Sequence, residues 1–222
     1  MKDTLTIIKK EWRSFFGSEK GVFAVHGILI FVWSFIPLSS GSGSVLSGNP
    51  LWWLFFSVIV SGSFANSVFV AERLSGSMEI LLTSGFPRNS VLLGKTGFVI
   101  LMAVVIGGLS FALSFLWASL ISKQCLFQTD SLLFGALLYC AGTFMNAAAG
   151  AWMSIRLSSP RLLPFVNLLF VGLVCGIYYA LRYAAGVPGW PLFLFLAAAG
   201  IAFLLLAKKD FNGEKIIAPL DL

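Results

Sequence analysis

Residues 72–95 read ERLSGSMEILLTSGFPRNSVLLGK, a short polar insert between two long apolar runs. The insert carries five charges, on Glu72, Arg73, Glu79, Arg88 and Lys95. A charged, amphipathic segment between two hydrophobic runs is typical of a loop that a membrane protein presents to water. The class of fold therefore depends on whether the flanking runs are membrane spans.

The composition is that of an integral membrane protein. The chain has 222 residues, of which 58% are hydrophobic and 11% are charged, whereas soluble domains average about 25% charged residues. That leaves too little polar surface to cover a water-soluble globule. The formal charge of +6 is explained by basic residues at the ends of membrane helices, so we expect no nucleic-acid partner.

The apolar runs predict an all-α membrane protein with a single transmembrane domain, residues 1–222. A helix of about 20 residues crosses the roughly 30 Å hydrocarbon core of a bilayer. Transmembrane β-strands would be about ten residues long, with alternating polarity. The expected spans are residues 22–38, 51–71, 96–121, 132–155, 162–181 and 190–207.

The basic residues predict the orientation of these spans. Of the 15 Lys and Arg residues, 13 fall on the side of the two termini and of the 72–95 insert, while only Lys123 and Arg182 fall on the other side. The positive-inside rule then places both termini and the insert in the cytoplasm. The expected outer boundaries carry aromatic residues, as in an interfacial belt: Trp52, Trp53, Trp117 and Trp190.

Residues 1–20 precede the first span and predict an interfacial helix. Leu5, Ile8, Trp12, Phe15 and Phe16 recur at helical spacing, while the Lys and Arg residues fall mostly elsewhere on the wheel. Such a helix lies in the headgroup region with its apolar side down. We expect Trp12, Phe15 and Phe16 to be anchors in the interface, and a docking role for this helix is an equally good interpretation.

Small and weakly polar residues stand inside several spans. Gly142, Asn146 and Gly150 follow one another at four-residue intervals, and Asn66 and Asn167 occupy two other spans. Small residues at this spacing let helices approach closely, and an Asn can hydrogen-bond across the contact. We interpret the group mainly as helix-packing residues. The alternative is a polar lining for a substrate path.

The expected spans contain no Asp, Glu, Lys or Arg. Carriers driven by protons or sodium need an ionisable group at membrane depth, and His26 is the only candidate here. We interpret His26 as a structural residue near the end of the first span. The three cysteines, Cys125, Cys140 and Cys175, are too few and too scattered to predict a metal cluster.

Residues 94–96 read Gly-Lys-Thr and resemble the end of a P-loop. A P-loop also needs a Gly where Asn89 stands, so we expect no nucleotide site in this chain. Lys95 is instead expected to extend its ammonium group to the lipid headgroups. No catalytic motif is found, and we expect no catalytic residues, no bound metal and no cofactor of the chain's own.

The 72–95 insert resembles the cytoplasmic loop of type-2 ABC exporter permeases. The family pattern is Glu-Arg, Gly-Thr/Ser, Glu, a Leu pair, an Arg after a turn, and Leu-Gly-Lys at the start of the third span. Residues 10–13, Lys-Glu-Trp-Arg, look like the family's interfacial helix. This chain has Ser84 and Gly85 where the family turn has Thr-Pro, and residues 182–189 are too short for the family's re-entrant helices. The matching residues are Glu72, Arg73, Gly76, Ser77, Glu79, Leu81, Leu82, Arg88, Leu93, Gly94 and Lys95.

The resemblance implies that residues 72–95 contain a coupling helix, which rests in a cleft of a separate ATPase subunit. Glu72 and Arg73 would hold the end of the second span, and Gly76 with Ser77 would start the short helix. Glu79, near the first turn of that helix, would interact favourably with the positive end of the helix dipole. Met78, Leu81 and Leu82 would form the apolar face that enters the partner's groove. Arg88 would belong to the same ATPase-coupling set.

The function implied is that of the permease subunit of an ATP-binding-cassette exporter in a bacterial inner membrane. The partners would be an ABC ATPase subunit, which holds the ATP and Mg²⁺, and a second copy of this chain or a related permease. From the residues themselves we expect a lipid-like or amphipathic substrate, because the spans offer Phe-rich and weakly polar surfaces without fixed charge. One alternative is a non-transporting ABC-type membrane module that couples ATP hydrolysis by a partner ATPase to mechanical work or to assembly of a cell-envelope machine, with a periplasmic or envelope partner. Another is an uncoupled channel or scaffold.

Overall fold

The structure of the protein is a computed structural model that describes residues 2–18, 20–39, 51–121, 129–156, 162–186 and 189–211. All regular secondary structure in these ranges is helical, which confirms the expected all-α class. Lys123 and Cys125 lie outside the described residues. The elements are α1 (Lys2–Ser18), α2 (Lys20–Ser39), α3 (Leu51–Ala65), the π-helix η1 (Asn66–Ala71), α4 (Glu72–Leu74), α5 (Ser77–Thr83), α6 (Arg88–Ile121), α7 (Thr129–Arg156), α8 (Leu163–Ala185) and α9 (Trp190–Asp210).

Five segments are helical, long enough and apolar enough to cross a membrane: Trp52–Leu74, Arg88–Trp117, Leu133–Arg156, Phe165–Ala184 and Trp190–Asp210. They correspond to five of the six expected spans. In α2 the described apolar stretch, Ala24–Phe35, is shorter, so a sixth crossing by α2 stays a prediction. The helix α6 has 34 residues and is about 50 Å long at 1.5 Å per residue, so it extends beyond a hydrocarbon core.

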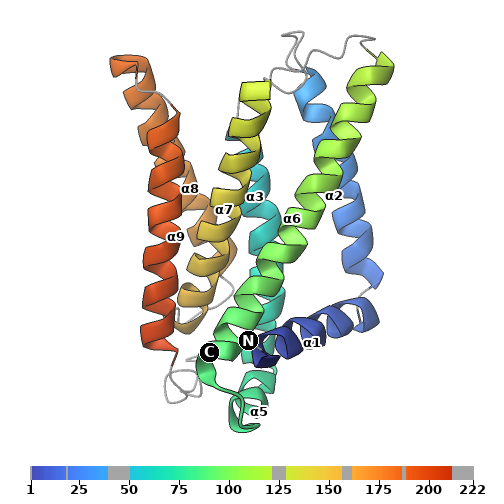
Figure 1. Cartoon of the computed structure of the whole chain (residues 1–222), viewed down its shortest axis with the longest axis vertical. Coiled ribbons are helices and arrows are strands. Elements are labelled where there is room, and N and C mark those ends of the chain that lie inside the picture. The colour runs from blue at the N-terminus through green and yellow to red at the C-terminus, as the bar shows by residue number, and fades with distance from the viewer. Residues whose placement is uncertain are drawn as a thin grey trace.

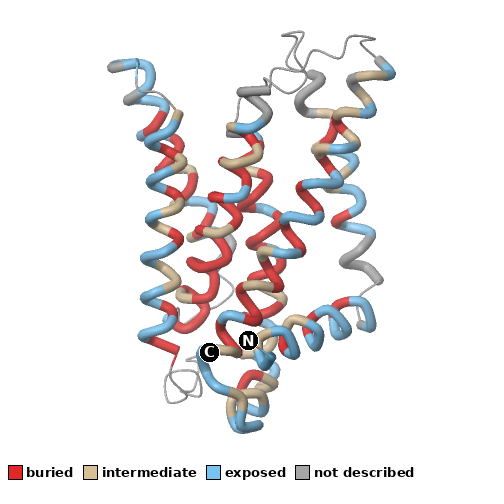
Figure 2. The backbone as a smooth tube through the Cα atoms, viewed as in Figure 1, coloured by how far each residue is buried: buried red, intermediate tan, exposed pale blue. Residues whose placement is uncertain are grey.

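The long helices stand side by side, while α1 lies across one end of the bundle and α5 protrudes there (Figure 1). We call this end the α5 end. The end of α9 and the start of α6 lie at the same end. The helix α3 packs against α6, α7 and α8, and α7 also packs against α9. The buried residues follow these contacts, so α3 and α7 are buried along most of their length, whereas α9 is largely exposed on its outer side (Figure 2).

Aromatic rings fill the contact between α3, α6 and α7. Trp53 is buried and stacks on Phe111, with ring centroids 3.7 Å apart, so it is a core residue and not the belt residue expected from its position. The Tyr139 hydroxyl donates a hydrogen bond to the Ala103 carbonyl oxygen at 2.6 Å. This bond joins α7 to α6 within the apolar core, where an unpaired hydroxyl would be costly.

The helices α2 and α9 are attached to this core from opposite sides. On α2, the buried Ser34 accepts hydrogen bonds from Ser114 and Trp117 of α6, at its carbonyl and hydroxyl oxygens respectively. His26 is also buried and stacks on Phe64 of α3, which agrees with a structural role. On the other side, Asp210 at the end of α9 accepts hydrogen bonds from Trp152 and Arg156 of α7.

Two glycines of α7 allow α3 and α7 to pack closely. A methyl group added at Gly150 would lie 2.8 Å from the Ala65 Cβ, and one added at Gly142 would lie 2.5 Å from the Leu54 Cδ1. Real Cβ atoms are not found at such distances. Gly142 and Gly150 therefore permit the close contact between α3 and α7.

The close packing predicts that Gly150→Ala destabilises the protein, although Ala is the better helix former. Both Cβ atoms at the contact are fixed to their backbones, so α3 and α7 have to separate, at a cost of about 1–3 kcal/mol. Gly108→Ala is the matched control, because nothing lies within 4 Å of a Cβ added there. Thermal unfolding in mild detergent measures both variants. A Gly150→Ala protein as stable as the Gly108→Ala protein would contradict this packing.

Candidate functional site

The candidate site is the α5 end of the bundle, built from α1, η1, α4, α5 and the start of α6. The chain leaves η1, continues through α4, and turns sharply at Gly76, which has a φ of +73°. A side chain is strained at that φ, so the turn favours glycine. Gly76 is the N-cap of α5, and its carbonyl oxygen accepts from the Glu79 amide at 3.1 Å.

Ser77 starts α5 but does not cap it with its side chain. Ser77 is the first helical residue, one position after the cap, and no side-chain capping hydrogen bond is formed there. Its hydroxyl instead lies 2.8 Å from the Ser75 hydroxyl. Glu79 does lie in the first turn of α5, where the negative charge of a carboxylate is stabilised by the positive end of the helix dipole.

The apolar face of α5 is turned toward the protein's own core. Met78 is buried, and Leu81 and Leu82 pack against the same cluster while partly buried. These three side chains were expected to enter a partner's groove; here Met78 is buried, while Leu81 and Leu82 keep part of their surface exposed. The outward side of α5 carries Ile80, which is 73% exposed, beside Glu79. A seven-residue helix that rests on a bundle uses its larger apolar face for that contact.

Lys95 is the centre of a buried charge cluster. Its side chain is fully buried, and its ammonium group lies 2.9 Å from Glu11 Oε1 and 2.5 Å from Glu72 Oε2. Lys10 completes the cluster, at 2.7 Å from Glu72 Oε1 and 3.1 Å from Glu11 Oε1. Two ammonium groups and two carboxylates thus neutralise one another. The expectation that Lys95 reaches the headgroups is wrong, because these carboxylates hold it inside the protein.

A backbone carbonyl from the π-helix completes the coordination of Lys95. Its ammonium group also donates to the Val68 carbonyl oxygen at 3.2 Å, so all three of its N–H groups have an acceptor. Val68 lies within η1, where the π-helical backbone departs from the regular i to i+4 pattern. Such departures are frequent at functional sites. The sequence did not reveal this helix, because nothing in residues 66–71 distinguishes it from α-helix.

The charge cluster ties α1 to the bundle. One face of α1 is buried and presents Ile7, Glu11 and Phe15 at four-residue intervals. Gly94 allows the close approach, since a methyl group added there would lie 2.8 Å from the Ile7 Cβ. Lys10, at the edge of this contact, is partly buried, which alone would lower its pKa. The hydrogen bond from Lys10 to Glu72 and the charges of Glu11 and Glu72 outweigh burial and raise this pKa above its ordinary value.

The expected anchors of α1 are divided between two faces. Trp12 and Phe16 are exposed, with ring centroids 4.7 Å apart, and Leu5 is exposed beside them. Phe15 is buried and stands 5.3 Å from the Phe64 ring of α3, centroid to centroid. The helix therefore docks on the protein through one face and leaves a second apolar face for the interface of a membrane.

Arg73 links the site to α7. Its guanidinium group donates hydrogen bonds to the carbonyl oxygens of Ser154 and Ile155, the latter at 3.5 Å. Both carbonyls belong to the last turn of α7, where the helix leaves acceptors without an internal partner and its dipole favours a cation. Glu72 and Arg73 thus hold the end of the second expected span, Glu72 to α1 and α6 and Arg73 to α7. Arg88 lies at the first position of α6 and is exposed.

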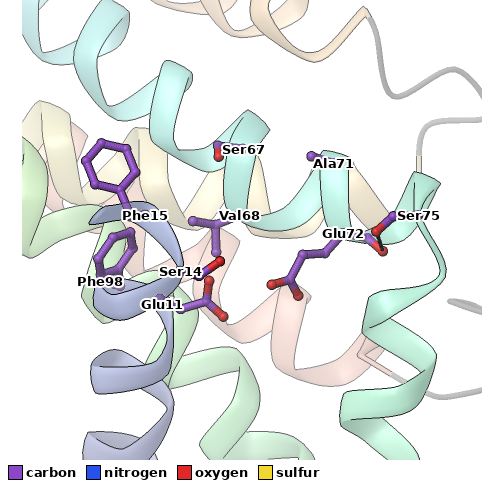
Figure 3. A pocket seen from close by; sticks show the side chains of 9 residues that line it. All are labelled: Glu11, Ser14, Phe15, Ser67, Val68, Ala71, Glu72, Ser75 and Phe98. Atoms are coloured by element: carbon purple, nitrogen blue, oxygen red, sulfur yellow. Dashed lines mark hydrogen bonds between the residues drawn. The ribbon is translucent and has the colours of Figure 1, made fainter. Parts of the chain in front are cut away.

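A cavity of about 250 Å³ lies beside the charge cluster. Figure 3 shows the carboxylates of Glu11 and Glu72 entering it from α1 and α4, with Ser14, Ser67 and Ser75 around them. Phe15, Val68 and Phe98 form its apolar wall. The carboxylates therefore border open space and are not completely packed, which lowers the free-energy cost of removing them from water.

A second cavity of about 300 Å³ lies between α8 and the α3–η1 segment. Some of the small and polar residues singled out in the sequence line it, and others do not. Asn66 and Asn167 line it, together with Ser63. Asn167 is 1% exposed, and its amide has no hydrogen-bond partner among the described residues. Asn146 is also buried and without a partner in that part of the chain, but it does not line the cavity. Asn66 and Asn167 thus line this cavity, whereas Gly142 and Gly150 do not.

The described residues contain no group of three or more His, Cys, Asp or Glu side chains that could hold a metal ion. Residues 94–96 lie inside α6 and not in a loop. No protein-family model matches the sequence, and no curated protein matches it either. The interpretation of the site therefore rests on its own residues.

The charge cluster predicts that Lys95→Met destabilises the protein by about 3–5 kcal/mol, because the buried Glu11 and the partly buried Glu72 lose their main partner. Lys9→Met is the control, since Lys9 is exposed on α1 beside Lys10 in the sequence and makes none of the cluster's ion pairs. Thermal unfolding in mild detergent measures both. The double variant Glu11→Gln with Lys95→Met should cost less than the sum of the two single variants. A Lys95→Met protein no less stable than the Lys9→Met protein would contradict the cluster.

Proposed function

We propose that this chain is the membrane-spanning permease subunit of an ATP-driven exporter of the type-2 ABC kind. Six helices, α2, α3 with η1, and α6 to α9, would span a bacterial inner membrane, with both termini and the α5 end in the cytoplasm. The observation that carries the proposal is the construction of residues 72–95. They form a short helix outside the bundle, held to it by Glu72 and Arg73 and entered through the turn at Gly76.

The partner at the α5 end would be a separate ATPase subunit that binds ATP and Mg²⁺. The surface offered to it is Ile80 with Glu79, and Leu74 and Arg88 are also exposed nearby. This surface fits an apolar pocket with a basic rim. Motion of the ATPase would reach α1 and α6 through Glu72 and α7 through Arg73, and the helices would move as rigid bodies.

The substrate would pass along the membrane-facing side of α3 and α8. The cavity lined by Asn66 and Asn167 contains no charged residue, so it fits an amphipathic molecule with a neutral hydrogen-bonding group. A second copy of the chain, or a related permease, would close this side. Transport that fails for every amphipathic compound tested, in a reconstituted system that moves a small ion, would contradict this class of substrate.

The turn predicts that Gly76→Pro and Glu72→Ala each abolish ATP hydrolysis that depends on the transported substrate. Proline fixes φ near −65°, opposite in sign to the +73° at Gly76. Glu72→Ala removes two bonds of the charge cluster. Both proteins should still insert into membranes. The measurement is ATPase activity of the reconstituted complex with and without substrate, and normal coupling in both variants would remove the role assigned to this segment.

The exposed surface predicts that Ile80→Asp weakens binding of the ATPase subunit by about 10- to 100-fold, as expected for a central apolar contact. Leu162→Asp is the matched control, because Leu162 is also exposed and precedes α8 beside the end of α7. Co-purification in mild detergent followed by titration of the ATPase subunit measures the difference. Equal binding by the two variants, or no ATPase subunit bound to the unmodified protein, would count against the proposal.

A further inference from the structure

The helix α1 carries an apolar strip that the protein leaves exposed. The strip consists of Leu5, Trp12 and Phe16, whose exposed fractions lie between 39% and 63%. At about 100° per residue these three side chains fall in one sector of the helix, next to Ile8. This sector borders the buried face, on which Glu11 lies, and it is distinct from that face. Its occupant therefore has to come from outside the described part of the chain.

Contacts with α6 show which way the apolar strip points. Ile7 of the buried face lies at Gly94 of α6, where an added methyl group would be 2.8 Å from its Cβ. Ile8, at the edge of the strip, lies at Gly97, 3.4 Å from a methyl group added there. Since α6 begins at the α5 end, the rotation around α1 from Ile7 to Ile8 runs away from that end. The strip continues the same rotation, so it faces along the length of the bundle.

Contacts with α3 and α4 give the same direction. Phe15, on the side of α1 nearer the strip, packs on Phe64 of α3, with ring centroids 5.3 Å apart. Lys10, on the other side of α1, pairs with Glu72 of α4, where the chain leaves the bundle toward α5. The side of α1 that carries Lys10 thus faces the α5 end, and the strip faces away from it.

The surface toward which the strip points is itself apolar. One turn past Gly97, the face of α6 that carries α1 is no longer covered, and Leu101 and Val104 are exposed there. Both lie within Arg88–Trp117, a segment long and apolar enough to cross a membrane. Because α1 lies across the end of the bundle and α6 runs along it (Figure 1), the strip and this face of α6 meet at a corner. Acyl chains fit this corner, whereas a water-soluble partner would have to enter the bilayer to reach the strip.

The edge of the strip that lies away from the protein is basic. Lys2, Lys9 and Arg13 occupy the next sector of the helix, and we call them the basic border. All three are exposed, and none belongs to an ion pair within the described part of the chain. The charges on the opposite side are different, since Lys10 is paired there and Asp3 is acidic. Three unpaired cations beside an apolar strip complement a surface of lipid phosphates.

We propose that α1 binds anionic phospholipid, with the apolar strip among the acyl chains and the basic border against the phosphates. The same helix presents Glu11, which lies 2.9 Å from the Lys95 ammonium group. The negative charge of the bilayer therefore holds α1 in the position that the charge cluster requires, and it stabilises the α5 end. This inference does not depend on the export function proposed above, because it needs only that the long helices cross a bilayer.

The test of the charge preference compares nanodiscs of dioleoyl phosphatidylglycerol with nanodiscs of dioleoyl phosphatidylcholine, which has the same chains and no net charge. Hydrogen exchange of the α1 amides in the unmodified protein should be several-fold slower in phosphatidylglycerol. Lys9→Gln combined with Arg13→Gln should remove most of this difference. The control combines Lys208→Gln with Lys209→Gln, which removes two exposed charges from the last turn of α9 and should keep the difference. Equal exchange in the two lipids, or an equal loss in both double variants, would overturn the proposal.

A second measurement locates the strip without using its charges. A bimane label is attached at Phe16→Cys or at Gly17→Cys, in a protein whose own cysteines are replaced by alanine. Gly17 is exposed outside the strip, and nothing lies within 4 Å of a Cβ added there. Brominated phosphatidylglycerol should quench the label at Phe16 several-fold more than the label at Gly17, and iodide in the water should do the reverse. Quenching of the Phe16 label by neither would indicate a protein partner on the strip, and stronger quenching by iodide would place the strip in water. Either result would overturn the proposal.

Discussion

The architecture of the α5 end depends on one buried ammonium group. Lys95 cannot be charged inside a protein unless acceptors surround it, because an unpaired buried charge is among the most unfavourable groups in a folded chain. Its acceptors come from α1, η1 and α4, segments that lie 84, 27 and 23 positions away in the sequence. The three hydrogen bonds of one side chain therefore fix three elements relative to α6. Gly94, one position earlier, provides the room in which α1 approaches.

From this cluster a chain of polar contacts runs across the end of the bundle. Arg73 passes from α4 to the last carbonyls of α7, and Arg156 at the end of α7 pairs with Asp210 of α9 at 2.7 Å. The contacts join the end of α3 to α7 and α9 without crossing the apolar core. The opposite end of α8 and α9 has a different character, with a groove lined by Leu173, Ile177, Leu192 and Phe195. One end of the molecule is thus cross-linked by charges, while at the other end α8 and α9 enclose an apolar groove.

The sequence predicted the elements well because each is encoded locally. Runs of about 20 apolar residues are visible without any knowledge of their neighbours, and so is the periodicity of α1 and the short helix after Gly76. What it missed are contacts between distant positions. The pairing of Lys95 with Glu11 joins residues 84 positions apart, and a lone Lys at the start of an apolar run has no sequence signal for that partner.

The direction in which a side chain points was the other source of error. The apolar residues of α5 were identified, but Met78 faces the core and Ile80 faces outward, since only the bundle beneath determines which face is covered. Asn66 and Asn167 line a cavity whereas Gly142 and Gly150 fill a helix contact. All four are small or polar residues within spans, and their surroundings separate them where residue type does not.

The π-helix η1 sets the rotational phase of everything that follows it. Successive residues of an α-helix are about 100° apart around the axis, and a π-helical turn absorbs one extra residue without passing that rotation on. If residues 66–71 closed into regular α-helix, Glu72 would turn away from Lys95 by about a quarter of a circle. Deletion of one residue within η1 is accordingly the one shortening of this span that keeps Glu72 directed at Lys95. The π-helical turn would become a regular α-helical turn, which contains one residue fewer.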